Sequence, residues 1–274
     1  MNNFVKRTLS GSFFVALIVS SILLSPYTFA PFFALISGWI VYEFHVLSNR
    51  QKDITVTPWV GSLGAVLLFL GSFLSSSGIW HFPVYVIYGF YVVLVLISEL
   101  YLQRANPLHN WAYFIMGQIY VALPFALLNY ILFLDRWQPL LLLSVFVTIW
   151  VNDTGAYLVG VSFGKHRLFE RISPKKSWEG FIGGALAALL SGYVFSLFIP
   201  QIRLIDWFIF SEIIVVFGTL GDLIESLIKR TVNVKDSGDV IPGHGGLLDR
   251  FDSMLLAAPV IFIYLCLLFD HVIK

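Results

Sequence analysis

Nine hydrophobic runs, each close to the length that crosses a bilayer, occupy most of this chain of 274 residues. A membrane-spanning helix needs about 20 mainly apolar residues. The first and third runs are short, which would suit a tilted or partly re-entrant segment. The runs cover about residues 9–25, 29–47, 58–74, 83–102, 111–134, 139–161, 178–199, 207–228 and 252–272.

The composition excludes a soluble or disordered protein. Hydrophobic residues make up 58% of the chain and charged residues 12%, against about 45–50% and 25% in soluble domains. A net charge of +1 gives no reason to expect a nucleic-acid partner. The single cysteine, Cys266, excludes a disulfide framework and a cysteine zinc site. We therefore expect an all-α, polytopic integral membrane helix bundle of about nine transmembrane helices.

The basic residues predict an orientation for these spans. With nine spans and a cytoplasmic N-terminus, 14 of the 17 Lys and Arg residues fall on the inside, and only Arg136, Arg203 and Lys274 fall outside. The positive-inside rule favours this arrangement. The two loops richest in basic residues, 162–177 and 229–251, then share the cytoplasmic side. We expect any chemistry to take place there, on the cytoplasmic face of the plasma (inner) membrane.

Acidic residues divide the chain into two halves. Of the 16 Asp and Glu residues, 11 lie between residues 151 and 252, and four lie in the first 150 residues. Ionisable groups near membrane spans are costly and indicate function. We therefore interpret residues 1–149 as scaffold spans and residues 150–274 as the catalytic half. Pro124 is expected to kink the fifth span.

The end of the eighth span carries one polar helix face. Asp222, Glu225, Ser226 and Lys229 are spaced so that they share this face, and Arg230 follows. A simple Glu–Lys pair at the helix end would explain part of the pattern. It does not explain Asp222, which lies in an apolar segment without a basic residue one turn away. We take Asp222 to be functional.

The loop before the ninth span has the composition of a phosphate and metal site. Gly243, Gly245 and Gly246 let the backbone approach an anion closely. Asp249 and Asp252 open the next helix, where the dipole favours carboxylates. Mg²⁺ takes one or two carboxylates together with phosphate oxygens, and Lys and Arg hold the remaining phosphate charge. The cations available are Lys229, Arg230, Lys235 and Arg250.

A third polar cluster follows the sixth span. Asn152 and Asp153 interrupt that span near its end, and a basic loop contains Lys175 and Lys176. The loop would satisfy the positive-inside rule alone, but its mixture of Ser, Pro, Lys, Trp and Glu exceeds that need. Ser173 or Ser177 is expected to cap the next helix, with Glu179 in its first turn.

Two of these regions resemble the phosphatidate cytidylyltransferases, the CDP-diacylglycerol synthases. Residues 226–252 resemble the diagnostic pattern of that family at all 27 positions, which include Ser226, Lys229, Lys235, His244 and Asp249. Residues 152–157 and 173–180 resemble a second region of the family. The resemblance covers about residues 150–253, and in the first half it rests only on hydropathy and length.

The resemblance implies the reaction of CTP with phosphatidate to give CDP-diacylglycerol and pyrophosphate, by an all-helical, homodimeric membrane enzyme. It implies Mg²⁺, with a monovalent cation such as K⁺ beside it, and it assigns the metal to Asp222 and Asp249. Lys229 and Ser226 join these two as catalytic candidates. The candidates for substrate binding are Asp153, Lys175, Lys176, Arg230, Lys235, His244 and Arg250.

Two other functions remain open from the sequence. A CTP-dependent lipid kinase acting on a prenol or dolichol would use similar machinery to transfer the γ-phosphate. An ion-coupled transporter would also contain intramembrane aspartates. A transporter predicts polar residues near the bilayer midplane and usually an internal repeat, whereas here the charges gather at one face and no repeat is visible.

Overall fold

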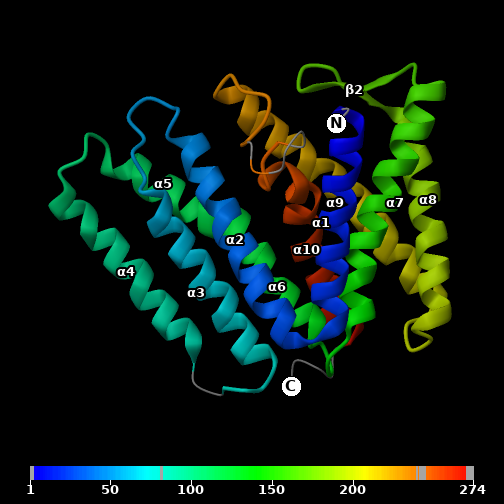
Figure 1. Cartoon of the computed structure of the whole chain (residues 1–274), viewed down its shortest axis with the longest axis horizontal. Helices are drawn as coiled ribbons and strands as arrows, with labels where there is room; N and C mark the ends of the chain where they lie inside the picture. Colours follow the sequence, from blue (N-terminus) through cyan, green and yellow to red (C-terminus); the bar gives the residue numbers. More distant parts are fainter. Residues whose placement is uncertain (1–2, 81–82, 239, 241–244, 270–274) are drawn as a thin grey trace. The chain divides into compact units, whose positions relative to one another are not determined.

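The computed structural model describes residues 3–80, 83–238, 240 and 245–269, with the backbone alone at residues 3–9 and 84. These described residues form nine helical segments and one β-hairpin (Figure 1). The helices are α1 (Asn3–Leu24), α2 (Pro26–Ser48), α3 (Pro58–Ser76), α4 (Val84–Leu102), the continuous segment α5 (Pro107–Met116), η1 (Gly117–Ala122) and α6 (Leu123–Leu132), α7 (Pro139–Phe163), α8 (Trp178–Phe198), α9 (Leu204–Thr231) and α10 (Leu248–Leu268).

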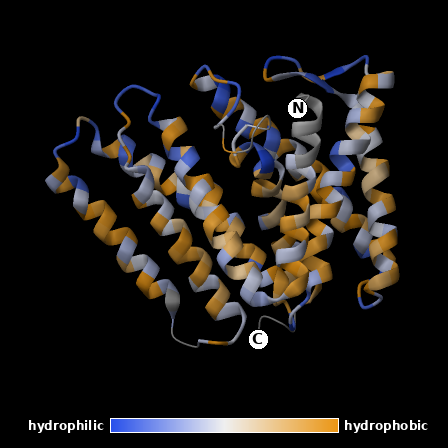
Figure 2. Cartoon of the chain, in the orientation of Figure 1, coloured by the Kyte–Doolittle hydropathy of each residue, from blue (hydrophilic) through white to orange (hydrophobic). Residues whose placement is uncertain are grey.

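The helices confirm the predicted polytopic membrane bundle. Within the described residues, eight helices are long and apolar enough to cross a membrane, and α1 adds the shorter apolar stretch Ser10–Leu24. Figure 2 shows hydrophobic residues along the helices and hydrophilic residues gathered mainly in the connecting segments. Each of the nine expected runs overlaps one helical segment. The chain is therefore a multi-pass membrane protein.

The fifth span changes its helical winding beside Pro124. Residues Gly117–Ala122 form a π-helix, and Pro124 stands in the first turn of the α-helix that follows. Proline lacks a backbone N–H and its ring clashes with the carbonyl four residues earlier. A π-helical turn widens the backbone at such a position. The sequence thus located the irregularity, and the structure shows its form.

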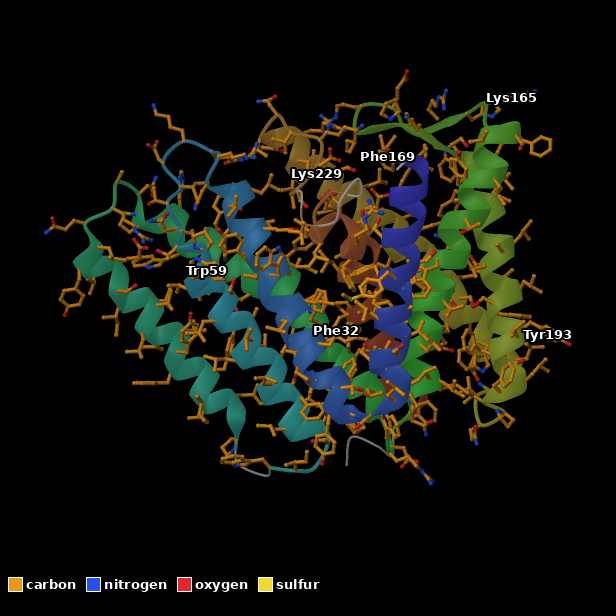
Figure 3. The ribbon with its side chains drawn as sticks, in the orientation of Figure 1. Phe32, Trp59, Lys165, Phe169, Tyr193 and Lys229 are labelled. Carbon is orange, nitrogen blue, oxygen red and sulfur yellow. The ribbon has the colours of Figure 1, made fainter. Side chains whose placement is uncertain are left out.

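The chain divides into two compact units. The first consists of Met1–Trp137 and Thr231–Phe251. In it α3 packs against α2, α4 and α6, and its core contains the fully buried rings of Phe29, Phe33 and Phe69. In Figure 3 Phe32 and Trp59 mark α2 and α3 of this unit.

The second unit consists of Gln138–Arg230 and Asp252–Lys274. Its helices α7 and α8 lie side by side (Figure 1). Small residues allow this close approach: a Cβ added at Gly155 of α7 would lie 2.7 Å from the Cβ of Ala187 and 3.0 Å from the carbonyl oxygen of Gly183. Close approach through small residues is the usual way that membrane helices gain packing contacts.

The assignment of residues 1–149 as scaffold and 150–274 as the catalytic half stays a prediction, because the division into two compact units does not test which part is catalytic.

The loop predicted over 162–177 contains a hairpin that the sequence did not reveal. Strand β1 (Arg167–Phe169) pairs antiparallel with β2 (Ser173–Ser177). Residues 173–177 contain Ser, Pro and Lys without an apolar alternation, so the usual signal of a half-buried strand is missing. The hairpin runs directly into α8. Figure 3 labels Lys165 and Phe169 at this end of the unit and Tyr193 farther along α8.

Candidate active site

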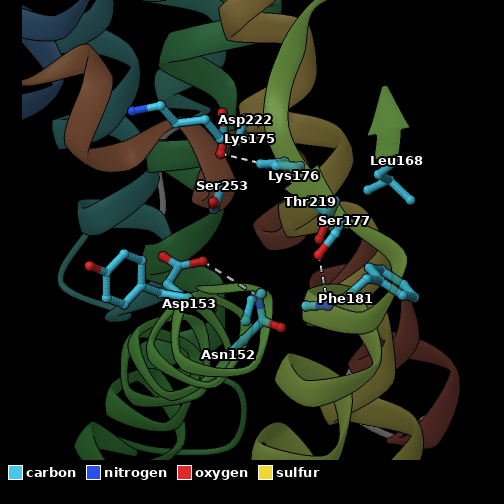
Figure 4. Close-up of a pocket in the computed structure, with 14 residues that line it drawn as sticks. Asn152, Asp153, Leu168, Lys175, Lys176, Ser177, Phe181, Thr219, Asp222 and Ser253 are labelled. Atoms are coloured by element: carbon cyan, nitrogen blue, oxygen red, sulfur yellow. Dashed lines mark hydrogen bonds and ion pairs between the residues drawn. The ribbon is translucent and has the colours of Figure 1, made fainter. Parts of the chain in front are cut away.

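The second unit contains a pocket of about 290 Å³ at the hairpin end of its helices (Figure 4). Four helices and both strands contribute to its wall. Its volume is at the lower end of the range typical of small-molecule sites. The lining residues are Asn152, Asp153, Ala156, Tyr157 and Gly160 of α7, Leu168 of β1, Lys175, Lys176 and Ser177 of β2, Gly180 and Phe181 of α8, Thr219 and Asp222 of α9, and Ser253 of α10.

An ion pair between Lys176 and Asp222 lies in this pocket. The Nζ atom of Lys176 is 2.6 Å from Oδ2 of Asp222, and both side chains are partly exposed (Figure 4). The Ser226 hydroxyl donates to the other carboxylate oxygen of Asp222 over 3.3 Å. No basic residue lies one turn from Asp222 on α9, and the cation that pairs with it is instead Lys176 of β2. Ser226 donates a hydrogen bond to the same carboxylate.

Two more aspartates, Asp153 and Asp252, lie in or beside the pocket. Asp153 lines the pocket, and the Asn152 amide donates to its carboxylate over 3.4 Å. Asp252 lies within electrostatic range of Asp222, Asp153 and Lys176. Gly221 permits this approach, because a Cβ there would lie 2.5 Å from the backbone carbonyl oxygen of Asp252. The arrangement favours a ligand that brings positive charge or bridges carboxylates to a cation.

The hairpin that supplies both pocket lysines is fastened to the start of α8. The Ser177 hydroxyl accepts a hydrogen bond from the Gly180 N–H over 3.1 Å, which confirms the predicted helix cap. Glu179, in the first turn, accepts from the Lys165 N–H over 3.0 Å and pairs with Nδ1 of His166 over 2.6 Å. The carboxylate thus joins the start of α8 to the chain just after α7.

Lys229 occupies a different environment from the pocket lysines. Its Nζ atom lies 2.6 Å from Oε2 of Glu225, one turn earlier on α9, and both residues are buried. The simple Glu–Lys pair considered from the sequence is therefore present. Lys229 does not belong to the pocket lining formed by the described residues, and Arg230 is exposed at the end of α9.

The loop candidates lie in the first unit. Oδ2 of Asp249 accepts hydrogen bonds from the Ser237 N–H over 2.9 Å, the Ser237 hydroxyl over 3.0 Å and the Gly246 N–H over 2.9 Å. Lys235 and Arg250 are exposed. His244, predicted to bind substrate, lies outside the described residues.

The oxygen-rich chemistry of the pocket fits Mg²⁺. Carboxylates of Asp222 and Asp153, with hydroxyls of Ser253 and Thr219, are the hard ligands that this ion prefers. Among the described residues no group of three or more His, Cys, Asp or Glu side chains is arranged to hold a metal ion. A Mg²⁺ bound largely through substrate phosphates needs only one or two protein carboxylates, so the donor set is compatible with it.

Comparison with known proteins identifies the family of the chain. The sequence pattern of the cytidylyltransferase family matches residues 5–268. The chain belongs to the cytidylyltransferase family. It is similar to a phosphatidate cytidylyltransferase of Bacillus subtilis, with 36% identity over 228 residues, which cover 80% of this chain and 82% of that relative. It is also similar to the protein of that name from Staphylococcus haemolyticus, with 34% identity over 263 residues, which cover 94% and 98%.

The match to the cytidylyltransferase family includes the N-terminal half of this chain as well as the motifs. The motifs that resemble the family cover about residues 150–253, whereas the family match extends from residue 5 to residue 268. The chain is therefore related to the family over nearly its full length. Its membership supports a nucleotidyltransferase activity.

We expect Glu179→Gln to loosen the hairpin. The neutral amide removes the charge that His166 and two backbone N–H groups contact, so trypsin should cut at Arg167 and Arg171 several-fold faster in detergent. The matched control is Glu170→Gln, an exposed glutamate in the hairpin turn. Equal cleavage rates in the two variants would contradict a fastening role for Glu179.

Proposed function

We propose that this chain is a phosphatidate cytidylyltransferase that transfers the cytidylyl group of CTP to phosphatidate, forming CDP-diacylglycerol and pyrophosphate for phospholipid synthesis. Its membership of the cytidylyltransferase family and the names of its relatives support this activity. The observation that carries the proposal is the ion pair between Lys176 and Asp222. It joins Lys176, which lies in one region that resembles the family, to Asp222, which lies four residues before the diagnostic pattern that begins at Ser226.

The reaction is a phosphoryl-group substitution. An oxygen of the phosphatidate phosphate forms a bond to the α-phosphorus of CTP, and the bond from that phosphorus to the bridging β-phosphate oxygen breaks. Pyrophosphate leaves with the electron pair. Such a substitution depends mainly on in-line positioning and on neutralising phosphate charge, and less on a strong base.

The pocket provides groups that position the substrates and groups that neutralise phosphate charge. Lys175 and Lys176 bind phosphate oxygens, and Lys176 exchanges its contact with Asp222 for a contact with substrate. Asp153 orients the polar end of the pocket through its bond with Asn152. Leu168 and Phe181 add apolar wall, which suits the glycerol and first acyl carbons of a lipid. This combination supports an amphiphilic phosphate ester as substrate.

The remaining candidates act on the triphosphate and the metal. Asp222 and Asp249 hold Mg²⁺, which when bound offsets the negative charge of the CTP phosphates. Lys229, Arg230, Lys235 and Arg250 bind phosphates, Ser226 supports Asp222, and His244 is assigned to substrate by the resemblance alone. A K⁺ ion beside the Mg²⁺ is part of the proposal, and exchange of K⁺ for choline in the assay tests it.

The enzyme resides in the plasma (inner) membrane as a homodimer with its active site facing the cytoplasm. The asymmetric distribution of Lys and Arg supports the orientation, and CTP is a cytoplasmic metabolite. Analytical ultracentrifugation in density-matched detergent tests the dimer, and a monomeric mass would contradict it.

Replacing either proposed metal aspartate should abolish turnover. Asp222→Asn and Asp249→Asn keep the side-chain volume but remove the charge, and Mg²⁺ prefers carboxylate to amide oxygen. The measurement is CDP-diacylglycerol formed from CTP and phosphatidate across a Mg²⁺ titration, with folding checked by circular dichroism. Asp53→Asn is the matched control, because Asp53 is exposed and its positive φ of 64° suits asparagine. Near-normal turnover in either active-site variant would refute the proposed metal role.

Single cysteines should report the proposed orientation. In a Cys266→Ser background, Glu170→Cys and Asp236→Cys should react with an impermeant maleimide only from the cytoplasmic side. Ile79→Cys should react only from the other side. All three positions are exposed. Labelling of residues 170 and 236 from opposite sides would contradict the shared cytoplasmic location of the two basic loops.

A further inference from the structure

A buried carboxylate in the N-terminal part of the chain contacts the loop that precedes α10. Glu43 lies near the end of α2 and is 5% exposed. Its Oε1 accepts from the Leu247 N–H over 3.1 Å, and its Oε2 accepts from the Leu248 N–H over 2.8 Å. Leu248 is the first residue of α10, so a side chain about 200 positions earlier caps the start of this helix.

Two side chains complete the hydrogen bonding of Glu43. The Trp39 indole N–H donates to Oε1 over 3.2 Å, and the Ser237 hydroxyl lies 3.4 Å from Oε2. Among the described residues the carboxylate makes no ion pair with Lys or Arg. N–H and O–H dipoles therefore stabilise its charge, as at an anion site on a helix N-terminus.

The loop backbone closes tightly around this carboxylate. A Cβ added at Gly246 would lie 2.6 Å from Oε2 of Glu43, and one added at Gly238 would lie 3.0 Å from Oε1. Real Cβ contacts are rarely so short, so glycine at 246 is needed for the loop to reach Glu43. Gly238 and Gly246 therefore leave room for the Glu43 carboxylate against the loop.

The same loop residues hold Asp249. Ser237 lies between the two carboxylates, since its hydroxyl is 3.0 Å from Oδ2 of Asp249 and 3.4 Å from Oε2 of Glu43. Gly246 donates its N–H to Asp249 and packs against Glu43. Any shift of the loop away from Glu43 therefore moves the donors that fix Asp249.

We propose that Glu43 is a positioning residue for Asp249: it fixes the junction of the 232–247 loop with α10, and thereby the orientation of the aspartate assigned to Mg²⁺. This role rests on the proposed function. It assigns part of the active-site geometry to a residue of the N-terminal half, which the sequence analysis interpreted as scaffold.

The first test is hydrogen exchange in the protein without ligands. Glu43→Gln keeps one acceptor oxygen but places an amide NH₂ against one of the two backbone N–H groups. Exchange in the peptide covering residues 245–251 should become faster by about tenfold or more, as expected for the loss of charge-assisted hydrogen bonds. Exchange in α7 and α8 should not change.

The second test measures metal binding without turnover. Thermal unfolding is followed with CTP present, phosphatidate absent, and Mg²⁺ varied. Glu43→Gln should raise several-fold the Mg²⁺ concentration that gives half of the maximal increase in Tm. Faster exchange with an unchanged Mg²⁺ midpoint would make Glu43 a structural cap only and would overturn the positioning role.

Glu99→Gln is the matched control. Glu99 is 7% exposed and lies in the same unit, and its carboxylate contacts Arg104 and Asn110 instead of the loop. This variant should lower Tm but leave both the exchange of residues 245–251 and the Mg²⁺ midpoint unchanged. If Glu99→Gln raised the exchange rate of residues 245–251 and the Mg²⁺ midpoint as much as Glu43→Gln, the effect would be a general one of removing a buried carboxylate. That result would overturn the proposal.

A second variant and a measurement that needs no turnover make the test of Glu43 independent of the proposed function. If Glu43→Gln does not fold, Trp39→Phe removes one donor from Glu43 while keeping an aromatic ring, and it should cause a smaller change in the same direction. If wild-type protein forms no CDP-diacylglycerol, the proposed function fails, while hydrogen exchange still decides whether Glu43 holds the loop. Unchanged exchange in both variants would overturn the inference even where Asp249→Asn abolishes activity.

Discussion

A bilayer interior offers no water to a backbone N–H or carbonyl, and this constraint organises the whole chain. Each unsatisfied backbone group in hydrocarbon costs several kcal/mol, so the spans must be helices whose hydrogen bonds close within the segment. Eight such helices are present among the described residues. Among the side chains proposed to bind phosphate and metal, Lys175, Lys176 and Asp249 lie in a connecting segment or at a helix end.

The same constraint explains how the protein handles charges that must remain at these ends. Lys176 pairs with Asp222 and Lys229 with Glu225, whereas Glu43 is stabilised by the N–H groups at the start of α10. A carboxylate or ammonium left alone in an apolar surrounding would be costly. These contacts give the carboxylates of Asp222, Glu225 and Glu43 polar partners at the ends of apolar spans.

Some of the structure was predictable because it depends on local sequence. Hydropathy located the nine helical segments, since a span is recognised by its length and composition alone. Ser177 and Glu179 were predicted at the start of α8 because capping involves neighbours in sequence. The candidate function of Asp222 followed from the cost of a carboxylate in an apolar segment.

Other features depend on contacts between distant residues and left no local signal. The hairpin forms from a segment without apolar alternation, and it brings Lys176 to Asp222 across 46 positions. Glu43 contacts residues about 200 positions away and resembles any isolated acid in an apolar helix when only the sequence is seen. Only the tertiary arrangement could distinguish its role from that of Glu99.

The position of the transferred phosphorus tests cytidylyl transfer most directly. Purified protein is incubated with phosphatidate, Mg²⁺ and CTP labelled at either the α- or the γ-phosphate, and the lipid is extracted. Cytidylyl transfer predicts that the α-label enters the lipid as CDP-diacylglycerol while the γ-label appears in pyrophosphate. Entry of the γ-label into lipid, with release of CDP, would contradict cytidylyl transfer and identify a lipid kinase.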